Sequence, residues 1–376
     1  MDPELHYRTL SHSVEIDTLA SAIASTQLPT GEIPWHTGGK TDPWDHVEAA
    51  IGLSIGGYLE EARRAFEWLA SVQLEDGGWY SSYMNGVPQD MTRESNHSSY
   101  IAVGVFHYYL ITQDRAFLEF IWPTVSAGVD FAVSLQGPGG EIFWAKSPQG
   151  TIDPMSLLTG SSSTYMSLKC ALVLALLLGE SRPAWQAALK RLEEAICYRS
   201  YLFNKSKSRF SMDWFYPVLC GAMTNNEAKK RIDRFWNKFV VENLGVRCVS
   251  DNPWITMAET SELVISLAAM GENELAETIL SWILDKRYED GSYYCGYTFP
   301  DMVIWPEEKL TWTNAAVMMA ADALYRITPA FQLFNHSFWQ EGQKSHMYHF
   351  LKKRHPIFSI KDAFYSDIQD IRAEYR

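Results

Sequence analysis

Two kinds of apolar segment alternate along the chain, and this alternation limits the possible folds more than any other feature. Six segments have one apolar and one polar face at helical spacing: 12–27, 58–73, 114–136, 182–200, 225–242 and 272–287. Six others are apolar nearly all round: 43–56, 95–112, 156–179, 212–223, 254–270 and 310–327. A helix that is apolar on every side has to be buried on every side. The sequence therefore predicts an all-α protein, an (α/α)6 barrel whose six helical hairpins form an inner and an outer ring.

A short motif recurs where the two-faced segments end. It reads Gln-x-x-x-Gly-x-apolar at 27–33, 73–79 and 136–142, and a degenerate copy begins with Arg at 287–293. The glycine suits a turn with positive φ after a helix. The copies support a repeated hairpin, and the pattern breaks after Pro329. We therefore expect a barrel domain over 1–328 and a partly helical C-terminal appendage over 329–376.

The composition argues against several classes of protein. The five cysteines are scattered without the spacing of a zinc site, and the histidines at 346, 349 and 355 form no closed ligand set. The formal net charge is −13, without a basic patch for nucleic acid. The longest wholly apolar run, 170–178, is too short for a membrane span. We expect a cytoplasmic protein without metal, cofactor or membrane span that acts on a small molecule, and its oligomeric state stays open.

The site is expected where the inner helices begin. In such a barrel their N-termini face one end, so helix dipoles and six loops meet there. Asp42, before Pro43, fits a helix cap, whereas Glu48 and Glu259 lie one turn inside apolar helices and have to be paired or catalytic. The residues predicted to bind substrate are Trp35, Trp44, Asp45, His46, Glu48, Trp79, Glu94, Asn96, His97, Tyr100, Tyr165, Trp214, Tyr216, Arg247, Asp251, Trp254 and Trp312. Trp79 has a structural interpretation as well, as the packing residue of its repeat.

The segment 107–131, with its His-Tyr-Tyr-Leu-Ile-Thr-Gln-Asp-Arg start, resembles the second-to-third hairpin of six-hairpin glycosidases, especially glucoamylase-like ones. The resemblance implies a carboxylic acid that protonates the leaving group and a carboxylate that acts as base or nucleophile. It places the base at Glu307 or Glu308. It places the acid directly after Trp144, where this chain has Ala145. Glu259 and Asp213 are the best candidates to replace that acid, and Glu94 and Asp153 are further ones.

The 73–79 copy of the motif also resembles the repeat of squalene-type cyclases and prenyltransferases. Their Asp-x-Asp-Asp acid and their zinc ligands have no match here, since the nearest pattern is Asp42-x-x-Asp45. Three hypotheses stay open. The first is a carbohydrate-active enzyme that uses paired carboxylates on a small glycoside or sugar. The second is a terpenoid cyclase or prenyltransferase-like enzyme of the same toroid fold, and the third is a non-catalytic binding barrel.

Overall fold

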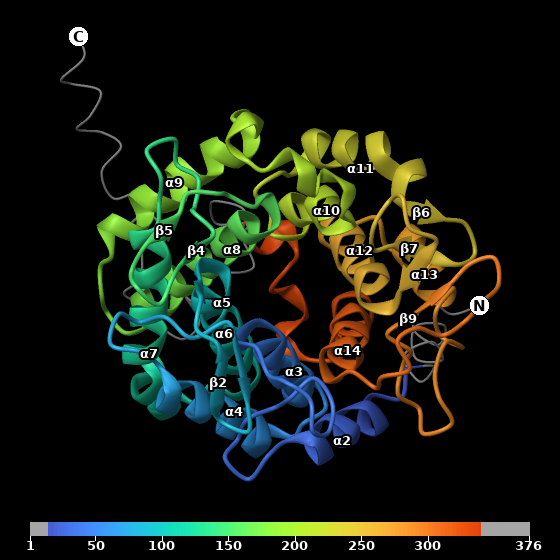
Figure 1. Cartoon of the computed structure of the whole chain (residues 1–376), viewed down its shortest axis with the longest axis horizontal. Coiled ribbons are helices and arrows are strands. Elements are labelled where there is room, and N and C mark those ends of the chain that lie inside the picture. The colour runs from blue at the N-terminus through green and yellow to red at the C-terminus, as the bar shows by residue number, and fades with distance from the viewer. Residues whose placement is uncertain (1–13, 340–376) are drawn as a thin grey trace.

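The computed structural model describes residues 14–339, and this part of the chain is mainly helical, as predicted. Six helices surround the centre of the molecule (Figure 1). Each packs against the next, and the last packs against the first, so they close an inner ring. A short helix, α5 (Ser95–Ser99), leads into the second of them. The six are α3 (Pro43–Ile55), α6 (Ile101–Thr112), α8 (Leu158–Leu177), α10 (Ser211–Leu219), α12 (Met257–Met270) and α14 (Thr311–Tyr325).

Six further helices pack outside this ring, one against each inner helix (Figure 1). They are α2 (Ile16–Thr26), α4 (Leu59–Val72), α7 (Arg115–Ser134), α9 (Pro183–Tyr198), α11 (Asn225–Phe239) and α13 (Asn273–Ser281). The two kinds differ in burial as the sequence predicts, because α8 buries nearly all its residues while α11 buries three. By length and composition α7 and α8 could each cross a membrane, but 94% of the apolar window of α8 is buried inside the protein.

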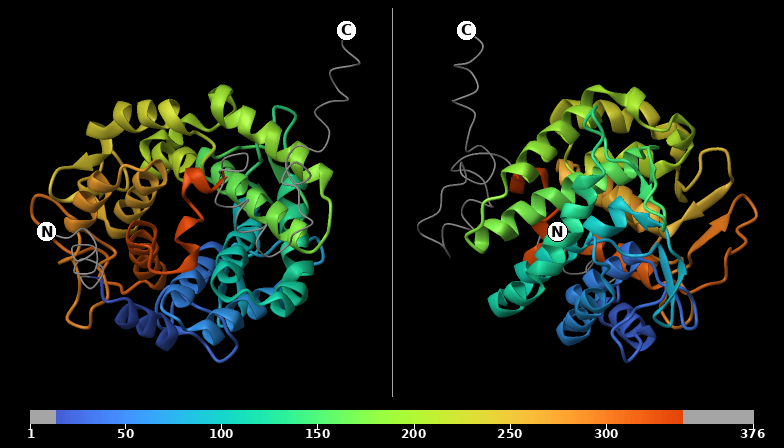
Figure 2. Two further views of the ribbon diagram at one scale, coloured as in Figure 1. Left: turned by 180° about the vertical axis from the view of Figure 1, so that it is seen from behind. Right: turned by 60° about the vertical axis from the view of Figure 1, so that its left-hand side comes forward.

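The inner helices all begin at one end of the ring, which we call the mouth, and end at the other, which we call the far end. Long segments lead into them at the mouth: 27–42, 73–94, 135–157, 199–210, 240–256 and 282–310. Short turns connect the helices at the far end: 56–58, 113–114, 178–182, 220–224 and 271–272. The two further views show that the long loops project from one side of the ring (Figure 2).

All nine strands of the described residues lie in these mouth loops, and all pair antiparallel. The first sheet joins β1 (Ser82–Met84) and β2 (Val87–Asp90). The second joins β3 (Arg93–Glu94), β4 (Ala145–Lys146) and β5 (Ile152–Asp153). The third joins β6 (Val240–Val241), β7 (Gly245–Arg247), β8 (Trp254–Thr256) and β9 (Gly296–Thr298).

Four boundaries of the predicted helices are wrong, and one of them is that of the inner helix predicted over 212–223, which ends at Leu219. Residues 254–256 are strand β8, because Trp, Ile and Thr favour a strand when partners are present on both sides. Residues 240–241 are strand β6 for the same reason, so α11 ends at Phe239. The outer helix predicted over 272–287 ends at Ser281.

The recurring glutamine motif proves to be a structural anchor. In each full copy the glutamine Nε2 donates to the glycine carbonyl four residues on and to a carbonyl of the next outer helix, at 2.9–3.0 Å. The glycines have positive φ, as predicted, and Gly77 has φ +86°. A Cβ at Gly77 would lie 2.2 Å from the Ala127 carbonyl oxygen. The motif therefore locks each mouth loop to its neighbouring hairpin, and no other residue fits the glycine position.

The ring closes between the two ends of the described chain. The Thr311 amide donates to the Trp35 carbonyl at 2.8 Å, and Thr311 Oγ1 donates to the Pro34 carbonyl at 2.9 Å. Two 3-10 turns, η3 (Pro329–Gln332) and η4 (His336–Trp339), then pack on α6, α12 and α14. The rest of the predicted appendage, 340–376 with its three histidines, lies outside the described residues, so the domain boundary stays a prediction.

Candidate active site

A cavity of about 420 Å³ opens at the mouth, where the sequence predicts the site. Its walls come from the first turns of α3, α5, α8, α10, α12 and α14 and from the loops before them. The predicted site residues that line it are Trp35, Trp44, Asp45, Glu48, Glu94, Asn96, His97, Glu259 and Trp312. The lining also includes Asp42, Asp90 and Glu262, which brings its carboxyl groups to seven, against a single lysine, Lys40. The cavity is therefore strongly acidic.

The start of α3 supplies three of these carboxyl groups at helical spacing. Asp42 caps the helix, as predicted, because its Oδ1 accepts from the Asp45 amide at 2.9 Å. Its Oδ2 accepts from Trp35 Nε1 at 2.7 Å. One turn further, Glu48 Oε1 accepts from Trp44 Nε1 at 2.7 Å. The indoles thus fix the carboxylates while they line the cavity themselves.

Two more carboxyl groups come from α12, one turn apart. Glu259 Oε2 is buried and has no hydrogen-bond partner in the described structure. Glu262 Oε1 accepts a hydrogen bond from the Tyr216 hydroxyl. Glu262 is absent from the predicted site, although its spacing of three residues from Glu259 on one helix could have indicated it. On the α12 side of the cavity, Glu259 Oε2 therefore has no hydrogen-bond donor, while the Glu259 carboxyl group lies beside the Cys248 thiol.

The environment keeps protons on several of these groups. Burial raises the pKa of Asp45 well above its usual range, and the charges of Asp42 and Glu48 raise it further. Burial also raises the pKa of Glu48 to about 7, and the Glu259 charge contributes to the increase. The pKa of Glu262 is raised by burial first and then by Glu48 and Glu259. The cavity therefore holds carboxylic acids that can donate a proton near neutral pH.

A carboxylate from the neighbouring strand lies beside Trp144, although position 145 itself has none. Glu94 on β3 lies directly opposite Ala145 on β4. Its Oε2 accepts from Trp144 Nε1 at 2.8 Å, and its Oε1 accepts from Ser81 Oγ at 2.8 Å. The neighbouring strand thus brings a carboxylate beside the indole, so Glu94 occupies a place where position 145 has only a methyl group.

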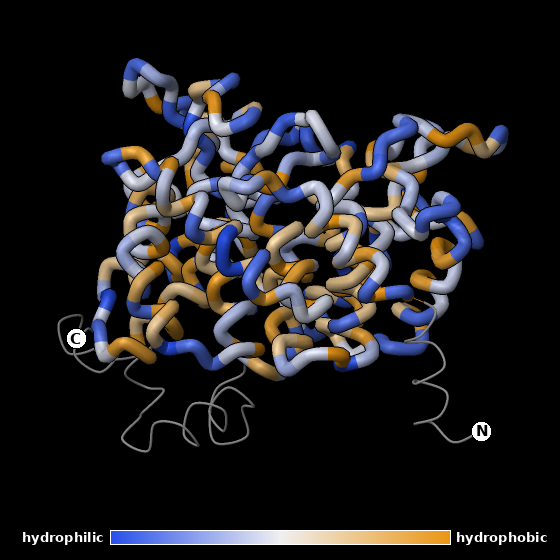
Figure 3. Tube along the Cα trace, turned by 90° about the horizontal axis from the view of Figure 1, so that it is seen from below, coloured by the Kyte–Doolittle hydropathy of each residue, from blue (hydrophilic) through white to orange (hydrophobic). Residues whose placement is uncertain are grey.

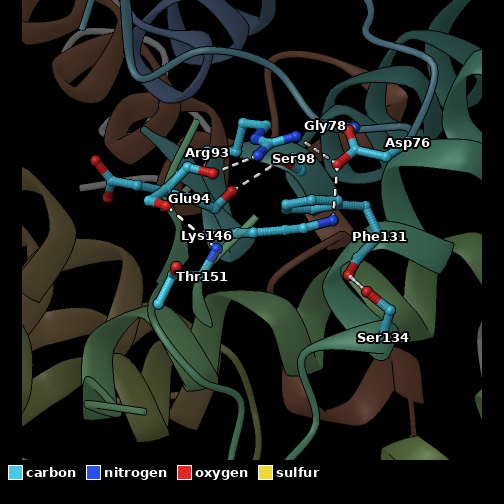
Figure 4. Close-up of polar contacts among 10 residues, drawn as sticks. Asp76, Gly78, Arg93, Glu94, Ser98, Phe131, Ser134, Lys146 and Thr151 are labelled. Carbon is cyan, nitrogen blue, oxygen red and sulfur yellow. Dashed lines mark hydrogen bonds and ion pairs between the residues drawn. The ribbon is translucent and has the colours of Figure 1, made fainter. Parts of the chain in front are cut away.

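An ion cluster anchors these strands (Figure 4). Arg93 Nη1 lies 2.7 Å from Asp76 Oδ2, and Lys146 Nζ lies 3.1 Å from the same oxygen. Asp76 belongs to the second glutamine turn, whereas Arg93 and Lys146 flank Glu94 and Ala145 on the paired strands. The cluster therefore ties the turn to both strands and holds the Glu94 backbone in place.

Three of the predicted residues belong to the core beneath the mouth. Trp79 is fully buried, and its Nε1 donates to the Leu69 carbonyl at 2.8 Å. Trp214 Nε1 donates to a main-chain carbonyl at 3.0 Å. Both ring nitrogens of His46 bond to the main chain, at 3.1 and 2.9 Å, and burial lowers the pKa of His46 to about 4. They pack the inner helices and are not part of the cavity lining.

Three predicted tyrosines are also buried behind the cavity. Tyr100 stacks on Trp44, with ring centroids 4.9 Å apart, and its hydroxyl lies 3.4 Å from Glu48 Oε1. Tyr216 bonds to Glu262, as described above. Tyr165 lies on α8 with its ring 5.4 Å from Lys169 Nζ. The first two therefore act on the site through a carboxyl group that lines it.

The predicted residues of the 240–256 loop lie apart from the cavity lining. Asp251 pairs with Arg209 at 2.7 Å on the surface. The Arg247 guanidinium lies over an aromatic ring at 5.1 Å. Trp254 packs edge-on against Trp305, with centroids 5.3 Å apart. Strand pairing turns this loop outward, which the apolar periodicity does not predict.

Three of the four predicted catalytic residues lie outside the cavity lining as well. Glu307 and Glu308 line a separate hollow of about 500 Å³, which also contains His36 and Asp290. Asp213 lies behind the cavity wall and accepts from Thr159 Oγ1 at 2.8 Å. Of these four, only Glu259 lines the cavity; of the two further candidates for the acid, Glu94 lines it and Asp153 does not.

Comparison with known proteins decides the family. No family model matches the chain. It is 49% identical over 315 residues to the MMP endo-(1,4)-3-O-methyl-alpha-D-mannosidase of Mycolicibacterium hassiacum. That match covers 84% of the chain and 87% of the mannosidase. The chain belongs to this family of glycosidases. Of the three hypotheses left open by the sequence, family membership selects the carbohydrate-active enzyme.

Solved structures share the fold of this glycosidase at low sequence identity. A GH63 mannosylglycerate hydrolase from Thermus thermophilus, in complex with glucose, has a TM-score of 0.63 at 13% identity, over 83% of the glycosidase and 99% of that chain. A D-mannose isomerase has a TM-score of 0.65 at 12% identity, over 83% and 96%. Since one fold serves a hydrolase and an isomerase, the chemistry of the glycosidase has to be argued from its cavity.

Proposed function

We propose that this enzyme hydrolyses internal α-(1,4) linkages in a chain of 3-O-methylated mannose units. The proposal extends to this chain the activity for which its 49% identical relative is named. It also assigns the ring to the (α/α)6 barrel of the six-hairpin glycosidases, supported by the order in which the inner helices contact one another. An acidic cavity at the mouth suits a neutral, hydroxyl-rich ligand.

One observation carries the mechanism. The cavity combines carboxyl groups with raised pKa on α3 with a carboxylate oxygen on α12 that has no protein donor. Glu48, three residues after Asp45 on α3, is close enough to Glu259 for the Glu259 charge to raise the pKa of Glu48. Glycosidases require this division, an acid for the leaving oxygen and a base for water.

In the proposed reaction Asp45 is the general acid and Glu259 is the general base. Asp45 gives its proton to the glycosidic oxygen while the bond from that oxygen to C1 breaks. Glu259 removes a proton from a water molecule, whose oxygen forms the new bond to C1. Direct attack of water inverts the configuration at C1. Trp35, Trp44 and Trp312 offer aromatic faces for the sugar rings.

The experiment compares Asp45→Asn with Glu259→Gln on aryl glycosides of the methylated mannose oligosaccharide. Each variant should lose about 10³-fold in kcat with a poor leaving group, the size expected of an acid or base. Only Asp45→Asn should recover with a dinitrophenyl leaving group, because this group departs without a proton. The loss of activity at high pH, which reports ionisation of the acid, should be absent from Asp45→Asn.

Glu307→Gln and Glu308→Gln serve as matched controls, since both residues lie in the separate hollow. We expect both to keep full activity. An inactive Glu307→Gln or Glu308→Gln beside an active Glu259→Gln would overturn the assignment of the base.

A further inference from the structure

Exposed apolar side chains gather on two loops at the mouth. Within the described residues, twelve large apolar side chains are strongly exposed, and half of them lie in these two loops. The hairpin of β1 and β2, with the residues after it, carries three, and the loop between β9 and α14 carries the others. We call these six residues, which are 40–59% exposed, the apolar rim: Met84, Val87, Met91, Met302, Val303 and Trp305.

The apolar rim is continuous with the cavity. Ser82 and Asp90, at the two ends of the hairpin, line the cavity, and the second loop runs into Trp312, which lines it too. In Figure 1, β2 and β9 lie on different sides of the ring centre. Seen from below, loops rise from the same end of the molecule at both of its edges, with apolar stretches among polar ones (Figure 3). The hairpin therefore borders the cavity at both of its ends, and the second loop continues into α14, whose Trp312 lines the cavity.

The cavity itself is lined by carboxyl groups, whereas the loops around its opening carry exposed apolar side chains. Single exposed apolar residues are common on proteins and need no explanation. A cluster at the tips of the loops that form a site is different, because it selects what binds beside that site. An unmodified mannose chain presents hydroxyl groups all along its edges and gains little from such walls. A chain with O-methyl groups has apolar projections that can pack there, and Met302 is adaptable enough to fit them.

We propose that the apolar rim binds the O-methyl groups of the sugar units on either side of the bond that is cleaved. This inference rests on the proposed function and adds how the enzyme distinguishes methylated from unmethylated chains. Each methyl group that is withdrawn from water should strengthen binding about fourfold. Three buried methyl groups would therefore favour the methylated chain by roughly 50-fold.

The test replaces apolar side chains of the rim by polar ones. Val87→Thr and Val303→Thr replace a methyl group by a hydroxyl, and Met302→Asn suits the positive φ of +56° at this position. The matched control is Ile327→Thr, an exposed β-branched residue just after α14, at the far end. The readout is kcat/KM on α-(1,4)-mannooligosaccharides of equal length, with and without 3-O-methyl groups.

We expect the wild-type enzyme to prefer the methylated chain, and the triple variant to lower the ratio of the two kcat/KM values about tenfold. Ile327→Thr should leave the ratio as it is. An unchanged ratio in the triple variant would overturn the inference. It would also be overturned if light scattering gave the triple variant a lower molecular mass than the wild-type enzyme, because the apolar rim would then form contacts between copies of the chain.

Binding measurements separate this inference from the proposed function. If the wild-type enzyme cleaves neither chain, the proposed function fails. Titration calorimetry with the same two oligosaccharides then still decides the inference: tighter binding of the methylated chain, lost in the triple variant, supports it, and equal binding refutes it.

Discussion

The mouth and the far end of the ring are built from the same twelve helices but connected in opposite ways. At the far end the connections are short turns such as 56–58 and 113–114. At the mouth they run over 73–94 or 282–310 and carry all the strands of the described chain. Short turns are enough to hold antiparallel helices together. The length of the mouth loops therefore serves the site.

Polar groups are also treated differently at the two ends. At the far end the buried Asp322 carboxyl group accepts from the Thr328 amide at 2.6 Å and from its Oγ1 at 2.8 Å. His336 bonds to the Val218 carbonyl at 2.7 Å. At the mouth Asp42, Asp45 and Glu48 crowd like charges into two turns of α3, and Glu259 keeps an unpartnered oxygen. Burial raises the pKa of Asp322 and of Glu48 alike to about 7, so the ends differ in where such groups lie: Glu48 lines the cavity and Asp322 does not.

The largest difference in unfolding free energy between the two ends should appear when a turn glycine is replaced by alanine. Gly77 at the mouth and Gly57 at the far end have similar φ, +86° and +80°. A Cβ at Gly57 meets nothing within 4 Å, whereas one at Gly77 collides with a carbonyl oxygen. We expect Gly57→Ala to cost about 1–2 kcal/mol of unfolding free energy, the cost of the left-handed conformation alone. Gly77→Ala should cost roughly 4 kcal/mol or more, because the collision adds to that strain. Urea unfolding of both variants measures this, and equal costs would contradict the anchoring role of the motif.

At the far end, we expect the variant Asp322→Ala to lose stability and to keep its activity. Asp322→Ala leaves the Thr328 donors without their acceptor. This should lower the unfolding free energy by about 2 kcal/mol at pH 4 and by less at pH 8, because burial raises the pKa of Asp322 to about 7 and its ionisation then opposes folding. The kcat/KM of the folded enzyme should stay within twofold of the wild-type value, since Asp322 does not line the cavity. Thr328→Ser, which keeps both donors, is the control. A large loss of activity in folded Asp322→Ala would show that the two ends are coupled.

The smallest expected change in unfolding free energy is a gain, and it concerns Glu48 at the mouth. The pKa of Glu48 is raised from 4.5 to about 7, so ionised Glu48 destabilises the folded state. This destabilisation is absent below pH 4.5, grows between pH 4.5 and 7, and is complete above pH 7. Glu48→Gln should therefore raise the unfolding free energy by about 1 kcal/mol at pH 8, less than the full linkage value because the amide is buried too. Thermal unfolding at pH 4 and pH 8 tests it; a gain of equal size at both values would exclude ionisation as the cause.

The fold was the most predictable part of this protein because burial alone imposes it. Apolar periodicity locates all twelve helices, and local rules suffice for the Asp42 cap and for the positive φ of the repeat glycines. The positions of single side chains were less predictable. An aromatic residue at a helix entrance suits the core as well as a cavity, so Trp79 and Trp214 could not be told from Trp44.

Long-range pairing limited the prediction of the site. Glu94 comes to lie beside Trp144 only because β3 pairs with β4, some fifty positions away in the chain. The path of the 282–310 loop likewise decides that Glu307 and Glu308 reach a different hollow. Glu262 is the exception, because helical spacing from Glu259 was enough to include it.

The hydrogen bonds from Thr311 to the carbonyls of Pro34 and Trp35, which close the ring, have a consequence for biosynthesis. The bonds that close the circle join positions 277 apart in the chain. A polypeptide emerging from the ribosome therefore exposes the unpartnered flanks of its first and fifth hairpins until the sixth has been translated. Such an intermediate exposes apolar surface, and the ring cannot close before α14 has been made.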